Sequence, residues 1–185
     1  SDLNVMRQTL ILGALETVAY NVNRQISSLK IFEYGSVYQR KPEADSTVLA
    51  GYEEHPCFTL CVTGTPEKSW RTELKKGNYF ILKGYVELLL KRYGADLNQM
   101  VAEAAPADIF SEGMTYSLPG RGPQLLTMGT VNPALAKKFG IKQPVFVAEI
   151  NWNTLFTLIK RNKVAFKELP KFPEVRRDLA LLLDE

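Results

Sequence analysis

The stretch that decides the fold is Lys30-Ile31-Phe32-Glu33-Tyr34-Gly35-Ser36-Val37-Tyr38-Gln39-Arg40, whose apolar side chains alternate onto both faces of an extended chain. Such a run predicts a central strand that is covered on both sides. A second apolar run follows at Cys57-Phe58-Thr59-Leu60-Cys61-Val62. Residues 41–54 between the two runs contain proline, glycine and acids, and they predict a loop. The two strands should therefore form an antiparallel hairpin.

Helical spacing is present on both sides of this hairpin. Apolar residues recur at intervals of three and four from Ile11 to Ile26, which predicts an amphipathic helix with Thr9 as its N-cap. A second helix is expected at about 79–93, closed by Gly94. Its expected apolar face consists of Leu82, Val86, Leu89 and Tyr93.

The rest of the chain alternates short strands with short helices. Strands are expected at residues 100–104, 114–118, 125–131 and 145–150, with helices at 133–139 and 154–160. The sequence therefore predicts an α+β fold in which helices flank a mostly antiparallel sheet.

The composition is that of a globular protein. The chain has 185 residues, of which 45% are hydrophobic and 23% charged, so it can build a sizeable core. No apolar run approaches the roughly 18 residues of a membrane span, and the first residues carry no export signal. Two cysteines make no disulfide framework. We expect a cytoplasmic protein without membrane contact, and we interpret the chain, which starts without methionine, as a segment of a longer one.

The net charge of +3 is too small to indicate nucleic acid by itself. Residues 160–177, however, contain seven basic and two acidic side chains, a local charge of +5, together with Phe166 and Phe172. This stretch could follow an RNA backbone. A solvated helix end and linker is the simpler interpretation.

Few groups of residues in this sequence fit a catalytic or metal-binding site. His55, Cys57 and Cys61 would share one face of a strand, but they are the only histidine and cysteines, and a zinc site usually needs four ligands or three and water. A buried pair of thiols beside a loop histidine is the favoured interpretation. The glycine-rich segment 119–123 lacks phosphate-loop spacing and predicts a surface turn. We therefore expect no catalytic, cofactor-binding or metal-binding residue.

Several segments, in order, resemble the β subunit of bacterial phenylalanine–tRNA ligase. Met6-Arg7-Gln8-Thr9-Leu10-Ile11-Leu12-Gly13 is similar to that family's Leu-Arg-x-Ser-Leu-Leu-Pro-Gly, and the run 30–38 is similar to its Leu-Phe-Glu-x-Gly-x-Val-Phe. Further matches are Asn21-x-Asn23-Arg24, Tyr79–Glu87, Gly129-Thr130-Val131-Asn132-Pro133 and Phe146–Ile150. Residues 171–180 resemble the entry into the family's ferredoxin-like anticodon-binding domain.

This resemblance implies a module with the core fold of a class II aminoacyl-tRNA synthetase that does not catalyse. In that class an arginine that follows Gly-x-Val-Tyr in the second class II motif binds the ATP α-phosphate, and the matching position here is Gln39. A neutral amide cannot supply a cationic, bidentate clamp. The glycines and arginine of the third class II motif correspond to Glu149, Asn151 and Thr154. A carboxylate at Glu149 opposes a nucleotide by charge and by bulk.

The resemblance also implies an α2β2 heterotetramer that attaches phenylalanine to its tRNA with ATP and magnesium, with the chemistry in the α subunit. Residues 1–168 are expected to form the module, and 169–185 a linker and the first strand of a truncated anticodon-binding domain. Two alternatives stay open. One is an active adenylating enzyme that uses Arg40 or Arg121, and the other is a stand-alone RNA-binding module that uses residues 160–177.

Overall fold

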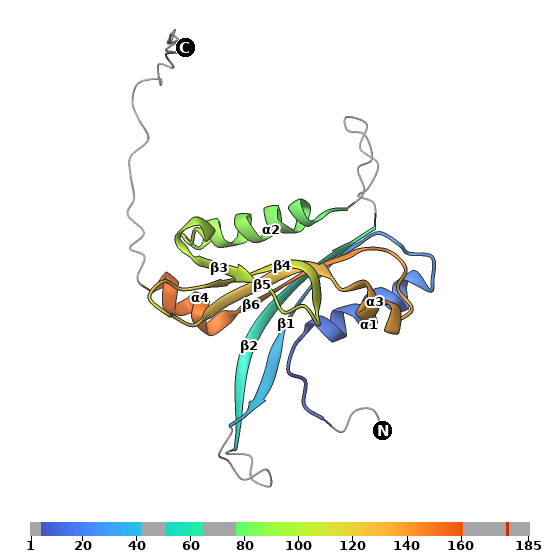
Figure 1. Ribbon diagram of the computed structural model, residues 1–185, viewed down its shortest axis with the longest axis horizontal. Helices are drawn as coiled ribbons and strands as arrows, with labels where there is room; N and C mark the ends of the chain where they lie inside the picture. The colour runs from blue at the N-terminus through green and yellow to red at the C-terminus, as the bar shows by residue number, and fades with distance from the viewer. Residues whose placement is uncertain (1–4, 42–50, 65–76, 161–176, 178–185) are drawn as a thin grey trace.

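The computed structural model describes residues 5–41, 51–64, 77–160 and 177. Six antiparallel strands form one sheet in the order β1-β2-β6-β5-β4-β3 (Figure 1). The strands are β1 (Leu29–Arg40), β2 (Tyr52–Thr63), β3 (Val101–Ala104), β4 (Phe110–Ser117), β5 (Gln124–Val131) and β6 (Val145–Asn151). The helices are α1 (Ile11–Val22), α2 (Tyr79–Arg92), η2 (Leu97–Gln99), α3 (Pro133–Lys138) and α4 (Trp152–Ile159). The predicted α+β architecture with an antiparallel sheet is confirmed.

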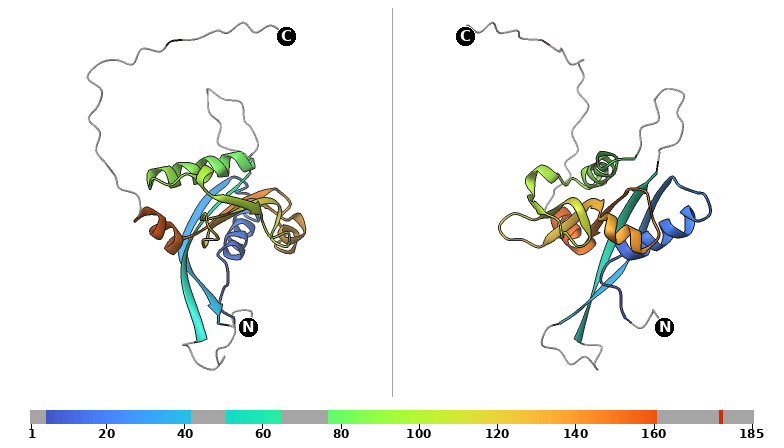
Figure 2. Two further views of the ribbon diagram at one scale, coloured as in Figure 1. Left: turned by 60° about the vertical axis from the view of Figure 1, so that its left-hand side comes forward. Right: turned by 45° about the vertical axis from the view of Figure 1, so that its right-hand side comes forward.

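The sheet separates two hydrophobic cores. On one face, α2 and α4 pack over the central strands around Leu82, Ala148 and Leu155, all buried. On the other face, α1 and α3 pack against Cys61 and Val147. Figure 2 shows α2 and α1 on opposite sides of the sheet. α1 covers only part of this face of the sheet, and a cavity lies on the part that α1 leaves uncovered.

The hairpin of β1 and β2 is longer than the sequence predicts. The two strands pair over their whole lengths, from Leu29 opposite Thr63 to Arg40 opposite Tyr52, whereas β2 pairs with β6 only from Cys57 onward. The far end of the hairpin therefore projects beyond the sheet (Figure 2). The expectation of a loop through residue 54 is wrong for Tyr52–Glu54, because antiparallel pairing with β1 continues there.

The prediction that residues 30–40 form a central strand is also wrong. β1 is an edge strand whose only partner strand among the described residues is β2. Phe32 is 73% exposed and Tyr34 58% exposed, on the face that carries α2 and α4. The N-terminal segment covers part of the outer edge of β1, on the side away from β2. Arg7 Nε donates to the Ser36 carbonyl at 2.8 Å, and Tyr38 N donates to the Arg7 carbonyl at 2.9 Å.

Both long helices differ from their predicted limits. α1 ends at Val22, so Ile26 lies outside it and is exposed. Thr9 precedes the cap position, although its hydroxyl accepts a hydrogen bond from Ile11 N. In α2 the fully buried third position is Leu90, whereas Leu89 is half-buried.

Tyr93, predicted on the same apolar face, lies just after α2 and is exposed. The shorter elements lie within a few residues of their predicted ranges. Across the described ranges, no helix has the length and hydropathy that crossing a bilayer requires. The strand expected at the end of residues 169–185 and the division at 168 lie outside the described residues.

Candidate functional site

A polar cavity of about 210 Å³ opens on the α1 face of the sheet, next to the N-terminal start of α1. It brings together side chains from four strands and the N-terminal segment. Its lining is Gln8, Val37, Gln39, His55, Cys57, Gln124, Glu149 and Asn151. Three positions that the family resemblance singled out, Gln39, Glu149 and Asn151, thus lie in one cavity. Thr154, the fourth position, is not in the lining and is buried in α4.

Glu149 is the one acidic side chain in this lining, and the chain itself binds its carboxylate. Oε2 accepts hydrogen bonds from the hydroxyl of Thr9 at 2.9 Å and from the backbone N–H of Leu10 at 2.6 Å. Leu10 is the N-cap of α1, so the carboxylate lies where a helix N-terminus favours negative charge. Glu149 therefore fixes the start of α1 to the centre of the sheet.

Burial raises the pKa of Glu149 above its usual value. The hydrogen bonds from Leu10 and Thr9, and the charge of Arg7, oppose this shift. Arg7 itself forms an ion pair with Glu33 at 2.7 Å, so its charge is shared between two carboxylates. The cost of desolvation is the largest cause of the raised pKa, as is usual for a carboxylate inside a protein.

Asn151 has a structural role as well. Its side-chain oxygen accepts a hydrogen bond from Thr154 N at 3.0 Å and caps α4. An asparagine at this position satisfies a backbone donor that the first turn of a helix leaves free. Two of the positions at which a nucleotide-binding synthetase would approach its ligand are therefore used for internal hydrogen bonds.

The lining does not suit ATP and magnesium. Among its described residues there is no lysine or arginine to balance phosphate charge, and its one carboxylate already accepts two hydrogen bonds. A volume of about 210 Å³ is also below the roughly 300–1,000 Å³ usual for pockets that enclose drug-sized ligands. Neither Arg40 nor Arg121, the cations on which an active enzyme would depend, belongs to the lining.

His55, Cys57 and Cys61 do lie on one face of β2, but His55 is a strand residue rather than part of a loop. Burial raises the pKa of Cys57 to about 11, with a further increase from the Glu149 carboxylate and an opposing effect of Arg7. Burial raises the pKa of Cys61 to about 12. Both thiols are protonated at neutral pH and are poor nucleophiles or metal ligands. Within the described residues, no cluster of three or more such side chains could hold a metal ion.

Sequence reasoning did not identify Gln8 or Gln124 as members of the lining, and it placed His55 in a loop. Gln8 reaches the cavity because its neighbour Arg7 is bound to β1. Gln124 opens β5 next to an irregularity in the pairing of β4 with β5. No spacing in the sequence indicates either contact.

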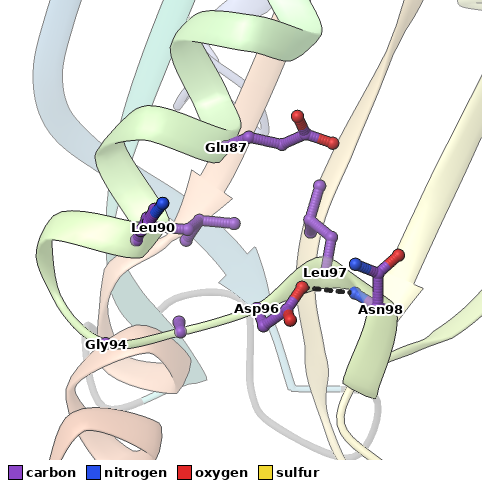
Figure 3. Close-up of a pocket in the computed structure, with 8 residues that line it drawn as sticks. Glu87, Leu90, Gly94, Asp96, Leu97 and Asn98 are labelled. Atoms are coloured by element: carbon purple, nitrogen blue, oxygen red, sulfur yellow. Dashed lines mark hydrogen bonds between the residues drawn. The ribbon is translucent and has the colours of Figure 1, made fainter. Parts of the chain in front are cut away.

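A second hollow, of about 450 Å³, lies between the end of α2 and η2 (Figure 3). Two carboxylates, Glu87 and Asp96, border it. Asp96 caps η2 by accepting from Asn98 N at 2.9 Å, and Glu87 lies 3.6 Å from the ammonium of Lys83. Both acids have local partners, and Lys91 is the one other ionisable side chain of the described lining, which contains no histidine, cysteine, serine or threonine. This hollow is therefore not a candidate active site.

The fold is that of an aminoacyl-tRNA synthetase module. A solved structure of pyrrolysyl-tRNA synthetase from Desulfitobacterium hafniense superposes with a TM-score of 0.58 at 14% identity, over 83% of this chain and 50% of that one. A likeness at this identity concerns the fold alone. The family model of the phenylalanyl tRNA synthetase beta chain CLM domain matches residues 1–152, and the chain belongs to this family.

Curated relatives of the chain are named as β subunits of phenylalanine–tRNA ligase. The chain is 42% identical to the phenylalanine–tRNA ligase β subunit of Bacteroides fragilis, 38% to that of Porphyromonas gingivalis and 34% to that of Streptococcus agalactiae. Each match covers 100% of this chain but only 22–23% of the relative, so the chain spans less than a quarter of their length. The resemblance inferred from the sequence is confirmed.

Proposed function

We propose that this chain is a catalytically inert, class II synthetase-like module of a phenylalanine–tRNA ligase β subunit. The complete enzyme would attach L-phenylalanine to its tRNA with ATP and magnesium in the cytoplasm, as an α2β2 heterotetramer. The α subunit would carry the chemistry. This module would hold that subunit in place and bind neither ATP nor magnesium itself.

The observation that supports the proposal best is that the Glu149 carboxylate already accepts hydrogen bonds from the chain itself. In a nucleotide site, the polar groups of the cavity would be left for the ligand. Here the one carboxylate of the described lining is bound by Thr9 and Leu10, and the lining offers a phosphate no cation. A triphosphate entering this cavity would meet a buried negative charge, which costs free energy unless that charge is paired.

The test has two parts. The full-length β subunit that contains this chain should copurify with its α subunit and elute as one complex on size exclusion. The isolated chain should catalyse no ATP–pyrophosphate exchange with phenylalanine, while the complex does. Exchange by the isolated chain above the blank would contradict the inert role, and failure of the two subunits to copurify would contradict the partnership.

A further inference from the structure

A short segment before α1 lies against the sheet beside the polar cavity. We call residues 7–10 the strap. Arg7 attaches the start of the strap to β1: its Nη1 forms an ion pair with Glu33 at 2.7 Å, and its Nε donates to the Ser36 carbonyl at 2.8 Å. The next residue, Gln8, belongs to the cavity lining. The strap therefore forms one wall of the cavity and is attached to the sheet through the side chain of Arg7.

The other end of the strap is attached to the centre of the sheet. The Leu10 N–H and the Thr9 hydroxyl both donate to the Glu149 carboxylate. The Leu10 side chain belongs to a buried cluster with Val37 and Cys57, and this cluster is separate from the two larger cores. Val37 and Cys57 also line the cavity. The strap thus helps to bury the apolar part of the cavity wall, including the Cys57 thiol.

The glycine at position 35 leaves room for the Arg7 side chain. Gly35 lies directly opposite Cys57 in the register of β1 and β2. A Cβ at Gly35 would collide with the Arg7 guanidinium and would lie 3.2 Å from Glu33 Oε1. Burial raises the pKa of Cys57, and the nearby charge of Arg7 opposes this rise. The guanidinium therefore occupies the space over Gly35, beside the thiol that the strap helps to bury.

The attachment at Arg7 is a weak one. The side chains of Arg7 and Glu33 are 45% and 39% exposed, and an ion pair that water reaches contributes little free energy and is screened by salt. The cluster of three residues under Leu10 also buries much less apolar surface than either larger core. Segments held by few contacts of this kind open at a lower free energy than the whole domain unfolds.

From these contacts we propose that the strap is a lid on the polar cavity. The lid opens when Arg7 leaves Glu33, and the opening exposes Cys57. The body of α1 stays in place, because Leu15 packs in a separate core on that face of the sheet. Cys61 belongs to the same core and therefore stays buried. The proposal goes beyond the proposed function and does not depend on it, since it concerns contacts within this chain alone.

The experiment compares how fast iodoacetamide alkylates the two cysteines in the folded, full-length β subunit, with each site resolved by mass spectrometry. Arg7→Gln removes the ion pair, whereas Gly35→Ala displaces the guanidinium and keeps every charge. In both variants we expect Cys57 to react at least about fivefold faster than in wild type, and Cys61 to react as in wild type. The matched control is Lys83→Gln, which removes an exposed ion pair on α2 and should change neither rate.

A salt series on the wild-type subunit tests the lid without a substitution, so it decides the matter even where a variant fails to fold. Sodium chloride at about 1 M screens the exposed ion pair and should accelerate alkylation of Cys57 but not of Cys61. The same salt should have much less effect in Arg7→Gln, because the ion pair is already absent.

Loss of the Arg7 charge alone would have the opposite effect. Without that charge the Cys57 thiolate forms less readily, so slower alkylation of Cys57 in Arg7→Gln would show a closed cavity and would overturn the proposal. Unchanged rates overturn it as well. Equal acceleration of Cys57 and Cys61 would mean that the whole module loosens, and it too overturns the lid. None of these results bears on ATP–pyrophosphate exchange, so the proposed function can hold where the lid fails.

Discussion

The carboxylate of Glu149 accepts a 2.6 Å hydrogen bond from the backbone N–H of Leu10, a residue 139 positions earlier in the chain. This contact joins the middle of the sheet to the first turn of α1. It also lies in the cavity that Gln39 and Asn151 line. One side chain thus anchors the start of α1 and, in the proposed function, leaves the cavity without a free carboxylate.

Glu149 should therefore respond differently to two substitutions. Glu149→Ala leaves the Leu10 N–H and the Thr9 hydroxyl without their acceptor, which should cost about 1–3 kcal/mol of unfolding free energy. Glu149→Gln keeps an oxygen that can accept both bonds and removes the buried charge, so it should be at least as stable as wild type at pH 7. Urea unfolding of both variants measures this. A glutamine variant as unstable as the alanine variant would mean that the charge itself is required.

The same substitution predicts a pH dependence. The folded state raises the pKa of Glu149 above 4.5, so it binds the proton more tightly than the unfolded chain does. Stability from this group is full at low pH and is lost as the pH rises through the folded pKa. Relative to wild type, Glu149→Gln should thus gain stability as the pH rises from about 4.5 towards 7. A difference between the two proteins that stays constant with pH would show that the folded pKa is not raised.

Two glycines in different environments should have opposite effects on stability when each is replaced by alanine. At Gly129 a Cβ would lie 2.7 Å from Gly113 Cα and 2.7 Å from Phe110 Cδ1, and it would also meet the Glu112 carbonyl. Overpacking of this kind should cost about 1–3 kcal/mol. Gly84, within α2, has no atom within 4 Å of a new Cβ, so Gly84→Ala should stabilise by about 0.5–1 kcal/mol. Thermal unfolding of the two variants measures the contrast, and equal effects would contradict the close approach of β4 and β5.

Much of this fold can be predicted from the sequence, but the errors have a common physical origin. Apolar residues on both faces of 30–40 predict a central strand, yet here the same pattern belongs to an edge strand that leaves Phe32 and Tyr34 exposed. In α2, three consecutive leucines, Leu88, Leu89 and Leu90, leave the helical phase undetermined by one position. Only packing against the sheet decides that Leu90 is the buried one.

The candidate site was predictable to a similar degree. Gln39, Glu149 and Asn151 could be placed together through the family resemblance, because each corresponds to a known motif position. The contacts of Glu149 with Thr9 and Leu10 could not, since they depend on how the N-terminal segment runs along β1. Long-range hydrogen bonds of this kind leave no periodic pattern in a sequence.

The two thiols should react slowly in the folded protein. With pKa values raised to about 11 for Cys57 and about 12 for Cys61, little thiolate is present at neutral pH. A chromogenic disulfide reagent should label them at a measurable rate only after denaturant unfolds the chain. Rapid labelling of either cysteine in the native protein would contradict its burial.

The domain division remains a prediction from the sequence. Pro170 and Pro173 disfavour regular structure around them, as in linkers between domains. Deleting residues 170–185 should then change the unfolding free energy of the module by less than about 1 kcal/mol. If the shortened chain is unfolded, the segment belongs to the core of this module.

The most direct test of the central claim, that this module is catalytically inert, is its melting temperature with and without magnesium and ATP. A ligand at 100 times its dissociation constant stabilises a protein by about 2.7 kcal/mol, which moves the melting temperature by several degrees. The α subunit, to which the proposed function assigns the nucleotide site, serves as the positive control. The account predicts no saturable shift for this chain, because Gln39 and Glu149 give phosphate no cation in the cavity. A saturable rise of that size would contradict it.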